Sequence, residues 1–179
     1  MARFVSIRLR AMQSHSDPAR TAGNDAANVW SGTPRLDGVR VLLAEGAPQV
    51  REVVADVLGQ CGAHVTAVDS AVAGLAILKR ERPDALVSSL SMPEKDGYWL
   101  IREVRKLPPD QGGDVPAAVF TGLSTPEHRR ASFQAGFQYH IPKPVALSRL
   151  AEVVALLTLK KSEAGEHRAT SASSPGDRP

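Results

Sequence analysis

Short apolar and β-branched runs alternate with helical repeats five times between residues 36 and 160. Runs of this length, bounded by polar, Gly or Pro residues, are typical of buried strands. They predict strands over residues 39–44, 63–69, 84–90, 117–121 and 138–141.

Apolar residues at helical spacing follow most of these runs, as on the buried face of a helix. A further helix is indicated by Ser124 and Glu127, which have the spacing of a capping box around Pro126, and it should end near Gly136. The other predicted stripes are Val50, Val53, Val54, Val57, Leu58 and Cys61; Val72, Leu75, Ile77 and Leu78; Leu100, Ile101, Val104 and Leu107; and Leu147, Leu150, Ala151, Val154 and Leu157.

Strictly alternating strand and helix units predict an α/β fold, a five-stranded parallel sheet with helices on both faces. In such sheets functional groups gather at the carboxyl ends of the strands. The residues that directly follow strands one, three, four and five therefore form the candidate site. They are Glu45, Gly46, Ser89, Thr121 and Lys143.

The two ends of the chain differ in composition from the part between them. Residues 1–35 and 161–179 are rich in Ser, Asp, Gly and Pro and lack apolar periodicity, so we expect both to be disordered around a domain at 36–160. The N-terminal arm holds five Arg and two Asp, whereas residues 36–160 hold 14 basic and 14 acidic residues. The domain therefore lacks the basic stripe expected of a nucleic-acid-binding protein.

The chain contains one cysteine, Cys61, which excludes an intramolecular disulfide and favours a cytoplasmic location. No apolar run approaches the roughly 20 residues of a membrane span, so we expect no stable membrane insertion. Residues 3–10 are basic and partly apolar. Three alternatives for them stay open: a contact with a membrane surface, a solvated tail, or translation that begins at Met12.

Four landmarks stand in order at the predicted strand ends: RVLLAEGAP at 40–48, MPEKDG at 92–97, Thr121, and Lys143 before Pro144. Together they resemble the receiver domain of two-component response regulators, which has a (βα)5 flavodoxin-like fold. Thr121 matches the hydroxyl switch residue of that family. Lys143 and Pro144 match its Lys-Pro pair, whose peptide bond is usually cis. The resemblance implies a signalling module and not an enzyme.

The sequence departs from the family at the residues that carry its chemistry. By the resemblance, the family has its phosphate-accepting aspartate at the position that Ser89 occupies here. Its magnesium-binding acidic pair falls at the positions of Glu45 and Gly46. Phosphoryl transfer needs a carboxylate acceptor and a divalent cation, and one Glu beside Lys143 is a poor ligand set for magnesium. We therefore predict a pseudo-receiver without aspartyl phosphorylation and without a magnesium cofactor. We further expect Lys143 to pair with Glu45 in place of the metal.

Several other residues are candidates for a switch or an interface. His140 falls where receivers often carry an aromatic rotamer switch, and its imidazole is alternatively a pH sensor or a structural group. Tyr98 and Trp99 open the third helix, and we expect one ring on the core and the other toward a partner. The remaining candidates, either a solvated helix face or part of a partner surface, are His128, Arg129 and Arg130.

These features favour a signalling module of a phosphorelay system that binds a histidine kinase, another receiver or an output protein independently of phosphorylation. We expect its output to be delivered in trans, and a homodimer through the fourth and fifth helices is an alternative. Two other functions stay open. In one, a displaced acid such as Asp96 or Glu94 accepts phosphate. In the other, the fold binds a nucleotide, although the chain has no GxGxxG turn or GxxxxGK[ST] loop.

Overall fold

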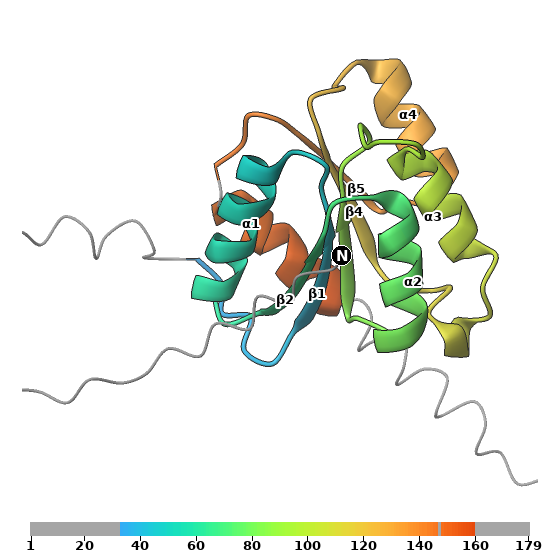
Figure 1. The fold of residues 1–179 in the computed structure, drawn as a ribbon. Coiled ribbons are helices and arrows are strands. Elements are labelled where there is room, and N and C mark those ends of the chain that lie inside the picture. The colour runs from blue at the N-terminus through green and yellow to red at the C-terminus, as the bar shows by residue number, and fades with distance from the viewer. Residues whose placement is uncertain (1–32, 147, 160–179) are drawn as a thin grey trace, which may run out of the picture.

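The computed structural model describes residues 33–146 and 148–159. Five parallel strands form one sheet in the order β2-β1-β3-β4-β5, which is the predicted α/β architecture (Figure 1). The two predicted disordered ends, the alternatives for residues 3–10 and the contact assigned to Leu147 lie outside the described residues, apart from residues 33–35. The strands are β1 (Arg40–Ala44), β2 (His64–Val68), β3 (Ala85–Ser88), β4 (Ala117–Thr121) and β5 (Tyr139–Pro142).

Helices cover both faces of the sheet (Figure 1). One face carries α1 (Pro48–Gln60) and a helix over residues 148–159. A short 3-10 turn, η1 (Pro109–Gln111), precedes β4. The other face carries α2 (Ala71–Glu81), α3 (Gly97–Arg105) and α4 (Pro126–Ala135). Strands β1 to β4 supply both cores because their side chains alternate between the faces. In β1, Val41 and Leu43 pack under α1, whereas Leu42 and Ala44 pack under α2.

Two residues of the predicted apolar stripes lie on the surface. Val53 of α1 is 50% exposed and Val72 of α2 is 48% exposed. Neighbouring residues are about 100° apart around a helix, so Val53 cannot face the sheet when Val54 does. The buried stripe of each helix is therefore narrower than the apolar pattern suggests.

The start of α4 is one residue later than the capping box predicts. Thr125, with its extended backbone, is the N-cap, and its Oγ1 accepts a hydrogen bond from the His128 N–H at 3.4 Å. Pro126 takes the first helical position, where a missing N–H costs nothing. Ser124 lies outside the helix, so the Ser124–Glu127 box was wrong.

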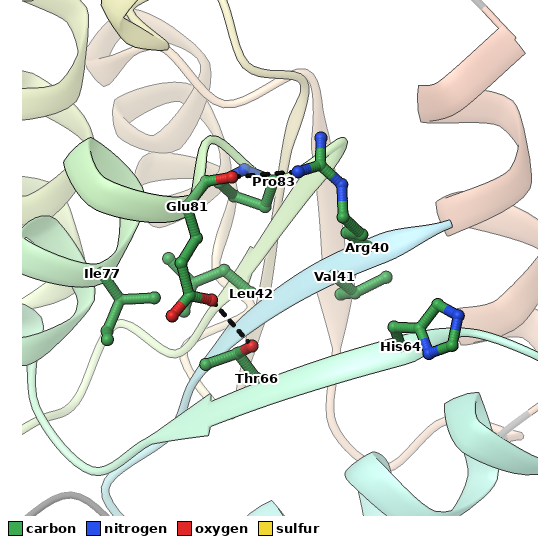
Figure 2. Close-up of a pocket in the computed structure, with 8 residues that line it drawn as sticks. All are labelled: Arg40, Val41, Leu42, His64, Thr66, Ile77, Glu81 and Pro83. Atoms are coloured by element: carbon green, nitrogen blue, oxygen red, sulfur yellow. Dashed lines mark hydrogen bonds between the residues drawn. The ribbon is translucent and has the colours of Figure 1, made fainter. Parts of the chain in front are cut away.

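A cavity of about 150 Å³ lies at the amino end of the strands, between β1, β2 and α2 (Figure 2). Arg40 lies at its rim and donates to the carboxylate of Asp84 and to the carbonyls of Glu81 and Arg82. The Thr66 hydroxyl donates to the Glu81 carboxylate at 3.1 Å. These polar groups bond to one another at the end of α2 farthest from the candidate site, so we assign them a structural role.

The turn between β3 and α3 is built on Asp96 and Gly97. The Asp96 carboxylate accepts from the Trp99 N–H at 2.7 Å and caps α3. The Gly97 N–H donates to the Leu90 carbonyl at 2.9 Å. A Cβ at Gly97 would collide with the carbonyl oxygen of Ser89, so glycine is required by close approach of the backbone.

This contact gives the first prediction. Replacing Gly97 by Ala should lower the free energy of unfolding by about 2–3 kcal/mol, because backbone must move to admit the methyl group. Gly59 is the matched control, since a Cβ at this helical position meets nothing within 4 Å. Gly59→Ala should raise the free energy of unfolding by about 0.5 kcal/mol. Urea unfolding of both variants measures the difference, and equal effects would contradict the assignment.

Candidate functional site

The candidate site lies at the carboxyl ends of the strands, where the strand order reverses between β1 and β3. Ala44 pairs in register with Ser88, and Thr121 pairs with Pro142. Glu45 and Ser89, which follow the first of these pairs, therefore lie side by side.

An ion pair links the residue that follows β1, Glu45, to the residue that follows β5, Lys143. The Lys143 Nζ donates to Oε2 of Glu45 at 2.6 Å, so the predicted pairing is confirmed. The Glu45 side chain is 4% exposed and that of Lys143 is 24% exposed. The ammonium also lies 4.6 Å from the centroid of the Phe120 ring, within the range of a cation–π interaction. The pair spans two intervening strands, β3 and β4.

Both oxygens of the Glu45 carboxylate have partners. Oε1 accepts from the Ala47 N–H at 3.0 Å, on the side away from Lys143. Arg51 of α1 donates to the Glu45 carbonyl at 2.6 Å and more weakly to the Gly46 carbonyl at 3.3 Å. Arg51 was not among the predicted site residues, and its only signal in the sequence is its place in the first turn of the helix that follows the site.

The backbone after β5 holds Lys143 in place. The Lys143 N–H donates to the Thr121 carbonyl at 2.7 Å. The peptide bond between Lys143 and Pro144 is cis, as the resemblance implied. Strands β4 and β5 therefore stay joined beyond their last paired residues.

No carboxylate stands at the other two positions of the site. Ser89 is buried, and its N–H donates to the Ala44 carbonyl at 2.8 Å. Ser88 is also buried, and its hydroxyl donates to the Ser89 carbonyl at 2.9 Å. A Cβ at Gly46 would lie 3.2 Å from Cδ of Pro93, which is tighter than ordinary contact. The turn that begins at Pro93 thus packs against the position of the missing acid.

Thr121 is buried, and its Oγ1 accepts from the Leu123 N–H at 3.1 Å. His140 lies nearby on β5, where its Nδ1 is 3.1 Å from the Ser132 hydroxyl. Burial, and then the charge of Arg129, lowers the pKa of His140 below its usual 6.5. The His140 side chain thus contacts α4, and the Thr121 hydroxyl bonds to the loop that precedes α4.

The two aromatic residues at the start of α3 do not divide as predicted. Tyr98 and Trp99 are both half-buried and pack against the same core cluster, because the start of α3 lies against α4. The Tyr98 hydroxyl lies 3.3 Å from both Nδ1 and the carbonyl of His128, whereas Lys95 Nζ lies 5.9 Å from the Trp99 ring. Both rings thus pack on the core, and a contact of either ring with a partner stays a prediction.

Two arginines of α4 are exposed to solvent. The guanidinium of Arg129 lies 5.6 Å from the Phe133 ring on the same helix, and Arg130 is also exposed. Half-buried His128 separates this exposed surface from α3. The three basic residues therefore do not form one uniform face.

Other acids and metal sites are also constrained by the geometry. Asp96 is engaged as the cap of α3, and Glu94 is exposed with a left-handed backbone at φ 62°. Within the described ranges, no three His, Cys, Asp or Glu side chains are grouped to hold a metal ion.

No helix in the described part of the chain is long and apolar enough to cross a membrane. Burial raises the pKa of the Cys61 thiol, which keeps it protonated.

Comparison with known proteins agrees with this geometry. Residues 41–155 match the response regulator receiver domain family, and the chain belongs to that family. An uncharacterised 14.6 kDa protein of Leptolyngbya boryana is 38% identical over 105 residues, covering 59% of this chain and 79% of its own length. Response regulator MprA of Mycobacterium leprae is 35% identical over 126 residues, covering 70% of this chain but only 54% of MprA.

Solved receiver domains share the fold. The receiver domain of Francisella response regulator 1452 superposes with a TM-score of 0.64 at 20% identity, covering 69% of this chain and 99% of that domain. The receiver domain of the Pseudomonas aeruginosa sensor histidine kinase PA1611 gives a TM-score of 0.63 at 27% identity, covering 68% and 98%. That domain was solved with a magnesium ion coordinated in its active site cleft.

The ion pair gives the second prediction. Replacing Lys143 by Met leaves a buried carboxylate without its cation and should lower the free energy of unfolding by about 2–4 kcal/mol. Adding Glu45→Gln should recover much of that loss, because the uncompensated charge is then removed. Urea unfolding of the two single variants and the double variant measures this coupling.

Arg149 and Glu152 supply the matched control. The N–O distance of their ion pair, 2.7 Å, is close to the 2.6 Å of the Lys143–Glu45 pair, but the side chains are 55% and 42% exposed. Arg149→Met should therefore change the free energy of unfolding by less than about 1 kcal/mol. A loss for Lys143→Met no larger than this would show that the buried pair is not a structural requirement.

Proposed function

We propose that this receiver domain acts by binding another signalling protein without aspartyl phosphorylation and without magnesium. The observation that carries the proposal is the internal ion pair, in which Lys143 already neutralises the single acid of the site, Glu45. The domain is in this proposal a pseudo-receiver of a two-component or phosphorelay system, and not an enzyme. A cytoplasmic location fits such a partner.

The residues present do not fit a magnesium ion. Hard cations bind carboxylate and other oxygen ligands, and they need several of them. Both oxygens of Glu45 are occupied by Lys143 and the Ala47 N–H, and Gly46 offers no side chain. A cation at this position would have to displace Lys143 from a buried bond before it gained one carboxylate.

Ser89 cannot replace an aspartate as acceptor in the same chemistry. An aspartate accepts phosphate as an anion, whereas a serine hydroxyl must first lose its proton to a base. The single acid of the site, Glu45, is bonded to Lys143 and to Ala47, so it is engaged elsewhere. Among the displaced acids considered, Asp96 is held as a helix cap. These contacts favour loss of phosphorylation over a relocated acceptor.

A surface suited to a partner lies between α4, β5 and the helix over residues 148–159. A groove of about 490 Å³, here named the α4–β5 groove, combines apolar and cationic groups in a way typical of protein interfaces. Phe133 at its edge is 42% exposed. The groove is lined by Arg129, Phe133, Gln138, Tyr139, His140, Ile141, Pro142, Val145, Arg149 and Val153. The same face would serve a homodimer through the fourth and fifth helices.

The third prediction tests the phosphorylation pocket. Amide NMR of the protein should show no localised shifts at Glu45, Ser89, Thr121 and Lys143 with millimolar magnesium or with added beryllofluoride, a mimic of the acyl phosphate. The receiver domain of PA1611 is the positive control because it coordinates magnesium. Saturable shifts at those four residues would overturn the proposal.

The fourth prediction tests the groove. Phe133→Glu should weaken binding of the partner, or self-association measured by sedimentation, by at least about tenfold, because an exposed aromatic anchor is replaced by a charge. Val72→Glu changes an equally exposed residue of α2 and should leave binding unchanged. The partner is first recovered by pull-down from the native host. Equal binding by both variants would exclude the groove as the contact surface.

A further inference from the structure

His140 lies on the opposite face of the sheet from the ion pair. Side chains alternate along β5, so Ile141 faces the core under α1, whereas His140 faces α4. In register, His140 pairs with Val119, which belongs to the core under α3 and α4. The imidazole is therefore placed between the last strand and the helix that bounds the α4–β5 groove.

One ring nitrogen of His140 bonds to α4. Nδ1 lies 3.1 Å from Oγ of Ser132, a residue that is fully buried. The Ser132 hydroxyl donates its proton to the His128 carbonyl at 2.8 Å. A hydroxyl has only one proton to donate, so Nδ1 must be the donor to Ser132. The neutral ring therefore carries its hydrogen on Nδ1.

The other nitrogen then has a lone pair and no partner. In the part of the chain that the structure describes, Nε2 of His140 is the buried side-chain nitrogen or oxygen atom without a hydrogen bond. A buried acceptor of this kind costs roughly 1–3 kcal/mol unless something compensates it. Such exceptions are few in folded domains, so each one needs an explanation.

The charged side chains that line the groove beside the ring are Arg129 and Arg149, and Arg149 is paired with Glu152. From α4, Arg129 and His128 disfavour a second proton on His140, and Arg149 of the helix over residues 148–159 lines the same groove. Burial acts in the same direction and is the largest cause of the lowered pKa. The backbone of Leu123, in the loop before α4, has a smaller opposing effect, although Nε2 makes no hydrogen bond to it.

We propose that His140 is a proton-operated latch between β5 and α4. The neutral ring lies inward and holds Ser132. The protonated ring leaves this site and turns into the α4–β5 groove, which it already lines and where water solvates the charge. The latch consists of contacts within this chain and needs no partner, so it holds or fails independently of the proposed function.

Release of the ring would reach three elements. Ser132 shares the His128 carbonyl with the Tyr98 hydroxyl of α3, which lies 3.3 Å from it. Leu123 is bonded through its N–H to Thr121 at the end of β4. Protonation therefore changes the contacts of α4 with α3 and with the β4–α4 loop, next to exposed Arg129.

The sign of the pH effect follows from the lowered pKa of His140. Below about pH 6.5 the unfolded chain takes up a proton that the inward ring resists, so the stability of the latched state falls as the pH falls through this window. At neutral pH and above, the His140 ring is neutral in both the folded and the unfolded chain. The hydrogen bond between His140 and Ser132 is then formed, so the latch is closed. Acidification is thus the opening signal.

NMR of the full chain, labelled with ¹⁵N, tests the latch between pH 5 and 8. We expect the neutral His140 ring to be the Nδ1–H tautomer, its midpoint to lie below 6.5, and the amides of Leu123, Arg129 and Ser132 to shift with the same midpoint. An Nε2–H tautomer, or a midpoint at or above 6.5, would overturn the proposal without any variant.

Three variants separate the titration of His140 from those of His128 and His64. His140→Phe should abolish the shared shifts of α4 and the extra loss of stability below pH 6.5. His128→Gln should leave both in place, with the midpoint moved slightly upward because His128 opposes the second proton on His140. His64→Gln, which alters an exposed histidine on β2 at the other edge of the sheet, should change neither. If α4 still titrates in His140→Phe, or stops titrating in His128→Gln, the proton acts elsewhere and the latch is wrong.

Discussion

A carboxylate that is almost fully buried needs a cation within reach, and Lys143 provides it for Glu45. Because Glu45 follows β1 and Lys143 follows β5, their bond closes the functional edge of the sheet across β3 and β4. The same requirement orients the loop before α1, where the Ala47 N–H takes the second carboxylate oxygen. The positions of two loops, β1–α1 and the one that follows β5, thus depend on neutralising one buried charge.

The missing acids and the ion pair form one consistent arrangement. Two further carboxylates at Gly46 and Ser89 would add negative charge that one lysine cannot balance, and a divalent cation would then be favoured. Without them, the charges of Glu45 and Lys143 sum to zero, as the proposed metal-free pocket requires. Pro93 packs close to the position where a side chain of residue 46 would begin. Electrostatics and packing therefore both favour a pocket that is complete within the chain.

Sequence patterns predicted the sheet and the ion pair because both follow from local rules. Apolar runs mark strands, and residues that directly follow parallel strands meet at one edge, so Glu45 and Lys143 could be paired before any coordinates. Contacts that depend on which residue faces across a gap were beyond such rules. Ser132 is a polar residue in a polar helix, yet it is fully buried because His140 of β5 lies opposite. Val53 is the reverse case, an apolar residue left exposed by the rotation of α1.

The two faces of the sheet differ in how completely their polar side chains are hydrogen-bonded. On the α1 side, the Glu45 carboxylate and Lys143 ammonium satisfy each other at 2.6 Å, and neither gains by moving. On the α4 side, the His140 ring satisfies one nitrogen and leaves the other without a partner. A group that is fully satisfied resists change, whereas a buried group with an unmet bond needs only a small free energy to choose another position. If a receiver lacks a phosphate switch, conformational control is therefore expected on the α4 side, where the proposed partner surface also lies.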